Sequence, residues 1–129
     1  MILLDTDVLI ELMQKGSKRG ETIFKKLQST NEEITTTTIN LHEILYALFK
    51  NGDFETATKI SDLNILEFTK NDAILAAKME FKLEKKGAKV ARLDCMIAAI
   101  AINNSAKLFT LNLKHFKRFE TFGLKLFRM

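Results

Sequence analysis

Segments with strand-like composition alternate with segments of helical spacing along this chain, and this alternation constrains the fold more than any other feature. Runs of apolar and β-branched residues predict strands over residues 2–5, 34–37, 63–68, 107–110 and 124–127. Helical spacing of apolar residues predicts helices over residues 7–14, 19–29, 41–50, 54–61, 72–86 and 93–103. The pattern predicts an α/β fold with a mostly parallel sheet of four to five strands and helices on both faces.

Length and composition fit one folded unit. The chain has 129 residues, of which 47% are apolar, and this predicts a single domain over residues 1–129 with a full hydrophobic core. The only cysteine, Cys95, cannot form an intrachain disulfide, which favours a reducing, cytoplasmic setting. The apolar start of the chain meets Asp5, so no signal peptide is expected, and the apolar run 95–102 is too short to cross a bilayer. We therefore expect a soluble, cytoplasmic protein.

Three acidic residues, Asp5, Glu43 and Asp94, each interrupt an apolar stretch of the sequence. Burying an unpaired carboxylate costs several kcal/mol, so three such positions in one small domain indicate that the carboxylates share a positive charge. A divalent metal ion would supply that charge and turn their mutual repulsion into joint coordination. A ligand set made only of oxygen atoms favours Mg²⁺ or Mn²⁺ over softer metals. The whole chain has only two histidines, so a zinc site built from imidazoles is improbable.

The expected topology brings the three acids together. In a parallel sheet, the reactive site lies at the carboxyl ends of the strands. Asp5 ends the first strand, while Glu43 and Asp94 lie in or beside helices that follow crossings to the same edge. Alternative interpretations are local: Asp5 as a helix cap, and Asp94 as an acid that favours the helix dipole or is neutralised by Arg92. Asp7 is the better candidate for the cap, which leaves Asp5 in need of another partner.

Basic residues cluster near these acids and indicate a polyanionic substrate such as RNA. The formal net charge is only +4, but the segment from Lys107 onward has six basic residues and a single acid. A second cluster leads directly to Asp94, and its members are Lys82, Lys85, Lys86, Lys89 and Arg92. The residues that we expect to bind substrate are Arg92, Thr110, Lys114 and His115.

Four segments, in order, resemble the motifs of the PIN domain family. They are Met1-Ile-Leu-Leu-Asp5-Thr-Asp-Val-Leu-Ile10, Thr35-Thr-Thr-Thr-Ile-Asn-Leu-His-Glu43-Ile-Leu-Tyr46, Leu93-Asp94-Cys-Met-Ile-Ala-Ala and Thr110-Leu-Asn112-Leu-Lys-His-Phe116. The short chain is most similar to the VapC toxins of type II toxin–antitoxin pairs. The resemblance implies a three-layer α/β/α fold and an Mg²⁺- or Mn²⁺-dependent endoribonuclease. It also implies catalytic roles for Asp5, Glu43, Asp94 and Asn112, with the first three as metal ligands. The implied partners are a second copy of the chain and a small VapB-like antitoxin.

Two positions depart from the family pattern. The fourth motif usually has Asp where this chain has Asn112, and the first more often reads Asp-Thr-Asn, whereas this chain has Asp7. One hypothesis is that Asp7 restores the carboxylate that Asn112 lacks. Two other functions stay open at this point. One is a haloacid-dehalogenase-like phosphatase with Asp5 as its nucleophile, and the other is a non-catalytic RNA-binding or dimerisation module with a degenerate site.

Overall fold

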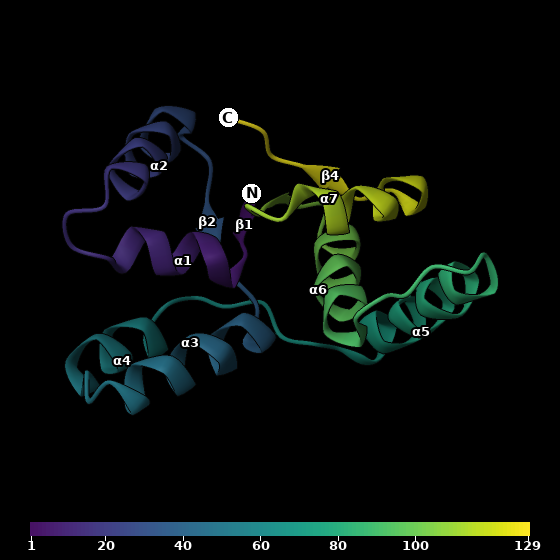
Figure 1. Ribbon diagram of the computed structural model, residues 1–129, viewed down its shortest axis with the longest axis horizontal. Helices are drawn as coiled ribbons and strands as arrows, with labels where there is room; N and C mark the ends of the chain where they lie inside the picture. The colour runs from purple at the N-terminus through teal and green to yellow at the C-terminus, as the bar shows by residue number, and fades with distance from the viewer.

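The computed structural model describes residues 1–129 and contains one sheet of four parallel strands in the order β2-β1-β3-β4 (Figure 1). The strands are β1 (Ile2–Leu4), β2 (Ile34–Thr35), β3 (Lys107–Phe109) and β4 (Lys125–Leu126). β1 is central, with Leu3 opposite Thr35 on one side and Leu108 on the other. β2 and β3 are separated from β1 by helices in the sequence, and both run parallel to it. The predicted parallel α/β sheet is therefore confirmed.

Helices cover both faces of this sheet and complete three layers. The helices are α1 (Thr6–Met13), α2 (Lys18–Thr30), α3 (Thr38–Lys50), α4 (Phe54–Ser61), α5 (Lys70–Lys85), α6 (Arg92–Asn103) and α7 (Leu113–Phe116), followed by the 3₁₀ helix η1 (Lys117–Phe122). Side chains of β1 alternate between the faces: Ile2 and Leu4 pack with α1–α4, and Leu3 packs with α5 and α6. In Figure 1, α1–α4 lie on the left and α5 and α6 on the right.

Helix α6 is the most deeply buried element, as its nearly uniform apolar sequence predicts. Six of its residues are buried, and they include Cys95 and the run from Ile97 to Ala101. Burial raises the pKa of the Cys95 thiol to about 11, so the thiol stays protonated and is an inert core group. No helix in this fold combines the length and the apolar character that a membrane crossing would need.

The strand predicted over residues 63–68 is not formed. This segment makes an isolated bridge between Leu66 and Thr37, supported by backbone bonds from Thr38 N to Leu66 O and from Leu66 N to Thr36 O. Leu63, Asn64 and Glu67 are exposed, whereas Leu66 and Phe68 are partly buried against the core on the α5–α6 side. The sheet therefore has four strands. Helices α7 and η1 were not predicted either, because their short runs show no extended helical period.

Gly20 lets helices α1 and α2 approach closely. A Cβ atom built on Gly20 would lie 2.3 Å from the carbonyl oxygen of Glu11, which belongs to the backbone of α1. Helix propensity alone favours alanine over glycine by about 1 kcal/mol. We expect the overlap to outweigh this gain, so Gly20→Ala lowers the free energy of unfolding by about 1–3 kcal/mol, as overpacked sites do. Urea denaturation measures the change, with Glu21→Ala as a control, and a variant as stable as the parent would contradict the expected contact.

Candidate active site

Asp5 follows β1 directly, and its carboxylate is almost fully enclosed, with an exposed fraction of 9%. The Asp5 Oδ1 atom accepts hydrogen bonds from Thr6 N at 2.9 Å and from Asn40 Nδ2 at 3.0 Å. Its Oδ2 atom accepts from the Thr110 hydroxyl at 2.7 Å. These donors come from α1, α3 and the end of β3, so the carboxylate is held in one orientation. Asp5, rather than Asp7, is the N-cap of α1, and the expectation that Asp7 fills this role was wrong.

Asp7 lies beside Asp5 and ties the first turn of α1 to the segment after β3. Its Oδ2 atom accepts a hydrogen bond from Leu111 N at 3.1 Å and lies 3.5 Å from the Thr110 hydroxyl. Its Oδ1 atom is buried and has no hydrogen-bond partner. Burial, and then repulsion from Asp5, raise the pKa of Asp7 above its ordinary value. Buried polar atoms normally have a partner, and no ion pair supplies one here. The Asp7 carboxylate therefore carries a charge that no side chain neutralises.

A polar network on α3 connects Asp5 to Glu43. Thr37 caps α3, and its hydroxyl donates to Asn40 Oδ1 at 2.7 Å. Asn40 is completely buried and donates through Nδ2 to both Asp5 and, at 3.0 Å, the Thr6 hydroxyl. Thr6 in turn donates to Glu43 Oε1 at 3.1 Å. Glu43 itself is exposed, so the expectation that it is buried was wrong: its carboxylate reaches the site from the solvent side.

Asp94 lies in the first turn of α6 and is half-buried. Burial is the largest cause that raises the pKa of Asp94, and the charges of Asp5 and Glu43 raise it further. The three predicted acids therefore act on one another electrostatically, although they come from α6, the end of β1 and α3. His115 and Arg118 are the basic side chains whose charges lower the pKa of Asp94. Neither forms an ion pair with it.

Arg92 does not neutralise Asp94, contrary to that alternative. Its guanidinium forms a two-pronged ion pair with Glu80 of α5, with N–O distances of 3.1 Å from Nε and 3.1 Å from the terminal nitrogen. Arg118, which the sequence did not single out, is instead the arginine whose charge lowers the pKa of Asp94. Its guanidinium donates to the Lys89 carbonyl oxygen at 2.7 Å. Residues two apart on a helix lie about 200° apart around its axis, so Arg92 points away from Asp94.

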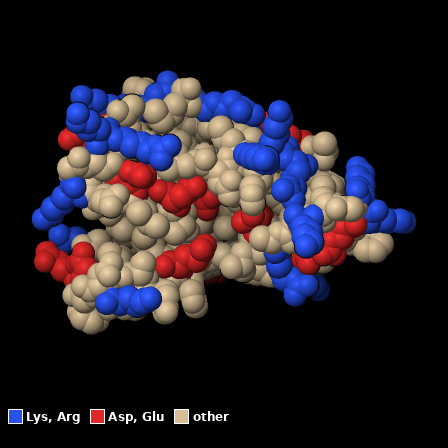
Figure 2. Space-filling model, in the orientation of Figure 1, with Lys and Arg blue, Asp and Glu red and all other residues tan.

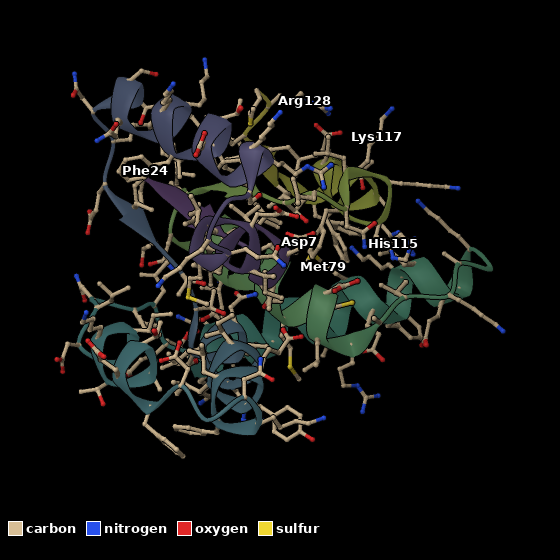
Figure 3. All side chains as sticks on the ribbon, turned by 60° about the vertical axis from the view of Figure 1, so that its left-hand side comes forward. Asp7, Phe24, Met79, His115, Lys117 and Arg128 are labelled. Atoms are coloured by element: carbon tan, nitrogen blue, oxygen red, sulfur yellow. The ribbon has the colours of Figure 1, made fainter.

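The segment after β3 holds the remaining predicted residues. Thr110 is buried, and besides donating to Asp5 it accepts a hydrogen bond from Asn112 N at 3.0 Å. The Asn112 side chain is exposed and makes no capping bond to α7, which leaves its amide free to face a ligand. Lys114 and His115 are exposed on α7, and Lys114 forms no ion pair. In Figure 3, Asp7 lies near the middle of the molecule, with His115 to its right.

The donor set fits a divalent cation, although no three acidic, histidine or cysteine side chains are gathered closely enough to hold one as they stand. The fit rests on Asp7 Oδ1, which is buried without a partner, and on the pKa of Asp94, which burial and then repulsion from Asp5 and Glu43 raise. Carboxylate oxygens are the ligands that Mg²⁺ and Mn²⁺ prefer. Figure 2 shows acidic atoms near the middle of one face, with Lys and Arg along its upper border and on its right.

The raised pKa of Asp94 predicts the stability of an Asp94→Asn variant without metal. The folded chain binds the Asp94 proton more tightly than the unfolded chain does, because its pKa lies above the ordinary 3.8. This group therefore lowers the free energy of unfolding as pH rises from below 3.8 through the raised pKa, and the loss persists at neutral pH. In EDTA, we expect Asp94→Asn to melt at a higher temperature than the parent at pH 7 and at a similar temperature near pH 3. Equal melting temperatures at pH 7 would contradict the unneutralised charge.

Comparisons with known proteins agree with this architecture. Residues 2–121 match the PIN domain, and the chain belongs to the PIN domain family. Two curated relatives are Ribonuclease VapC2 of Rickettsia felis and Ribonuclease VapC1 of Methanocaldococcus jannaschii. The first is 28% identical over 123 residues, covering 90% of each chain. The second is 27% identical over 127 residues, covering 98% of this chain and 86% of the relative. The resemblance read from the four motifs is confirmed.

Solved structures share the whole fold. VapBC2 from Rickettsia felis, crystallised with a DNA fragment from its promoter, superposes with a TM-score of 0.79 at 27% identity, covering 100% of this chain and 99% of that one. FitAcB from Neisseria gonorrhoeae gives a TM-score of 0.83 at 21% identity, covering 99% and 97% of the two chains, and shows the fold alone. The predicted three-layer PIN fold is confirmed.

Proposed function

We propose that this chain is a metal-dependent endoribonuclease and the toxin of a VapBC-type toxin–antitoxin pair. One observation supports the proposal above the others: Asp94 is subject to the negative charges of both Asp5 and Glu43, and no ion pair neutralises any of the three. Membership of the PIN family and two relatives named Ribonuclease VapC support the same activity. The family match and the named ribonuclease relatives favour this activity over a phosphatase with Asp5 as its nucleophile.

Asp5, Glu43 and Asp94 would hold an Mg²⁺ or Mn²⁺ ion. When bound, such an ion activates water and neutralises negative charge on a phosphodiester. The residues of this chain prepare the site by fixing the ligands: Asn40 and Thr110 hold the Asp5 carboxylate from opposite sides. Asn112 presents a free amide beside them and would orient water or a phosphate oxygen. The exposed Glu43 would complete the ligand set from solvent.

Basic residues on the Asp94 side would bind the RNA backbone. Arg118 and His115 face Asp94 electrostatically, and Lys114 is exposed nearby on α7. We infer that these three bind phosphates that flank the cleaved bond, because a guanidinium or ammonium group pairs strongly with phosphate oxygens. Arg92 is a weaker candidate than the sequence indicated, since Glu80 already occupies its guanidinium.

A small antitoxin and a second copy of this chain are the proposed protein partners. The solved relatives include VapBC2 of Rickettsia felis and a toxin–antitoxin complex from Klebsiella pneumoniae, which support an antitoxin. Large apolar side chains that remain exposed on α3 and α4 offer surface for such contacts, and they are Tyr46, Phe49 and Phe54. Light scattering of the isolated chain tests the homodimer, and a monomeric mass at micromolar concentration would exclude it.

Cleavage of single-stranded RNA tests the proposed activity directly. The purified chain should cut RNA when Mg²⁺ or Mn²⁺ is added, and EDTA should stop the reaction. Cleavage that persists unchanged in EDTA, after removal of bound metal, would contradict a metal-dependent mechanism. Absence of cleavage with metal-independent RNA binding would favour the non-catalytic alternative.

Asp7→Asn tests whether Asp7 contributes to the cation site. Because its buried Oδ1 has no partner and its neighbour Asp5 repels it, we expect the Asp7 carboxylate to gain from a bound cation. Asp7→Asn should then weaken Mn²⁺ binding by about tenfold, within the 10–100-fold range typical of groups around metal ligands. Titration calorimetry with Mn²⁺ measures the change, and Asp62→Asn on the exposed end of α4 is the control. Unchanged affinity would remove Asp7 from the site.

A further inference from the structure

A cavity adjoins the acidic site and shares one residue with it. This cavity, which we call the C-terminal cavity, has a volume of about 590 Å³ and lies between α2, the segment after β3 and residues 127–129. Thr110 lines it and also donates to Asp5 at 2.7 Å. A ligand in the cavity would therefore lie next to whatever occupies the acidic site.

The lining of the C-terminal cavity combines an apolar floor with two cations. Its apolar surface comes from Ile23, Phe109, Leu111, Leu113, Phe127 and Met129. The rings of Phe109 and Phe127 meet edge to face with centroids 4.8 Å apart. Arg19 of α2 and Arg128 also line it, and their side chains are 65% and 53% exposed. Each arginine has only a long ion pair, at 3.9 Å to Glu11 and 3.7 Å to Glu120. Figure 3 shows Arg128 beside the helix α2.

This composition matches a nucleotide better than a purely apolar or purely charged ligand. Pockets of roughly 300–1,000 Å³ with apolar walls and few polar groups are typical of small-molecule sites, and a nucleobase occupies a fraction of that volume. Flat bases pack favourably on apolar and aromatic side chains, while arginines attract the phosphates on either side. The hydroxyl groups in the lining are already engaged, since Thr22 donates to the Lys18 carbonyl and Thr110 to Asp5.

We propose that the C-terminal cavity binds the base of a nucleotide adjoining the cleaved phosphate, with Arg19 and Arg128 on its backbone. This inference rests on the proposed ribonuclease function and extends it to substrate recognition. The hydroxyl protons of Thr22 and Thr110 are donated elsewhere, and the two arginines are assigned to the backbone, so the cavity recognises a base mainly by shape and apolar contact. The cavity then sets how tightly single-stranded RNA binds, with weak preference among bases.

Two probes separate contact with the base from contact with the backbone. One is a fluorescein-labelled single-stranded RNA hexamer, and the other is the same sugar–phosphate chain without bases. Both are titrated by fluorescence anisotropy into the Asp94→Asn chain with Mg²⁺ present. Adding Thr22→Trp, an exposed position on the wall of the cavity, should weaken RNA binding about tenfold and leave the base-free chain within about twofold.

Arginine variants test the backbone contacts. Replacing both Arg19 and Arg128 by alanine should weaken binding of both probes at least about fivefold, because each arginine attracts phosphates. Lys26→Ala, on the same helix but outside the cavity lining, is the matched control and should change neither affinity more than about twofold. Equal weakening of both probes by Thr22→Trp, or no effect of the double arginine change, would overturn the proposal.

Methyl NMR of the Asp94→Asn chain, without any cavity substitution, gives a readout that does not depend on the folding of cavity variants. The Ile23 methyl resonances should shift when the RNA hexamer is added and should stay in place with the base-free chain. RNA that is bound and is cleaved by the parent, without any shift at Ile23, would refute the cavity assignment but leave the ribonuclease function intact. If the hexamer neither binds nor is cleaved, both proposals fall.

Discussion

Asp94→Asn is expected to abolish metal-dependent RNA cleavage while the fold is retained. Asp94 is half-buried at the start of α6, and its carboxylate faces Asp5 and Glu43 with no ion pair. Asparagine has the same shape but carries no charge, so it removes a metal ligand and relieves repulsion in the same step. The loss should be at least about a hundredfold, because changes to groups around metal ligands already cost 10–100-fold. The rate of cleavage of a labelled single-stranded RNA measures it.

Asp62→Asn provides the matched control for this experiment. Asp62 is exposed at the end of α4, away from the sheet edge, so the same chemical change there should leave the cleavage rate within about twofold. Circular dichroism and thermal melting establish that Asp94→Asn is folded. A folded Asp94→Asn chain that cleaves at the parent rate would remove Asp94 from the catalytic site.

Asn40→Ala is expected to cost both stability and activity. Asn40 is completely buried and donates to Asp5 at 3.0 Å and to Thr6 at 3.0 Å, while its oxygen accepts from Thr37 at 2.7 Å. Alanine leaves a buried carboxylate and a buried hydroxyl short of partners, which costs about 1–3 kcal/mol in the free energy of unfolding. It also frees Asp5 to rotate, which we expect to lower cleavage about 10–100-fold.

The two effects of Asn40→Ala are measured separately. Urea denaturation reports the free energy of unfolding, and cleavage is measured well below the midpoint so that unfolded chain does not contribute. Asn71→Ala, an exposed position on α5, is the control and should change neither quantity appreciably. If Asn40→Ala were as stable and as active as the parent, the network that orients Asp5 would have no functional role.

The sheet and the approximate site follow from local patterns in the sequence. β1 reads as a short apolar run that ends at Asp5, and α6 reads as an apolar helix that begins beside Asp94. Central elements of such a fold are buried on both sides, so their sequences are almost wholly apolar. Such runs can be assigned with few alternative structures. The parallel order of the strands then brings their carboxyl ends to one edge, so the convergence of Asp5 and Asp94 could be predicted.

Other parts of the site depend on tertiary contacts that no local pattern contains. The capping role of Asp5 rather than Asp7 depends on how Thr110 and Leu111 approach from β3, more than a hundred residues later. Asn40 could have been noticed, because it precedes Glu43 by three residues on α3 and therefore shares a face with it. Arg118 could not, since its position beside Asp94 depends on the path of η1.

The strand predicted over residues 63–68 is absent, which shows that β-propensity alone does not place a segment in a sheet. Leu63, Ile65 and Leu66 have strand-like character, but only Leu66 pairs with the sheet, through Thr36 and Thr38. Whether a β-prone segment joins a sheet depends on packing against neighbours more than on its own preference. The PIN site is unaffected, because all of its predicted ligands lie elsewhere.

Titration calorimetry of Mn²⁺ binding tests the central claim most directly. It compares the parent with three variants, Asp5→Asn, Glu43→Gln and Asp94→Asn. A single cation held jointly by the three carboxylates predicts that the parent binds Mn²⁺ and that each variant binds it at least about tenfold more weakly. It also predicts that Glu55→Gln, on the exposed side of α4, binds like the parent. Three variants that each retain the parent's affinity would show that these carboxylates hold no common ion.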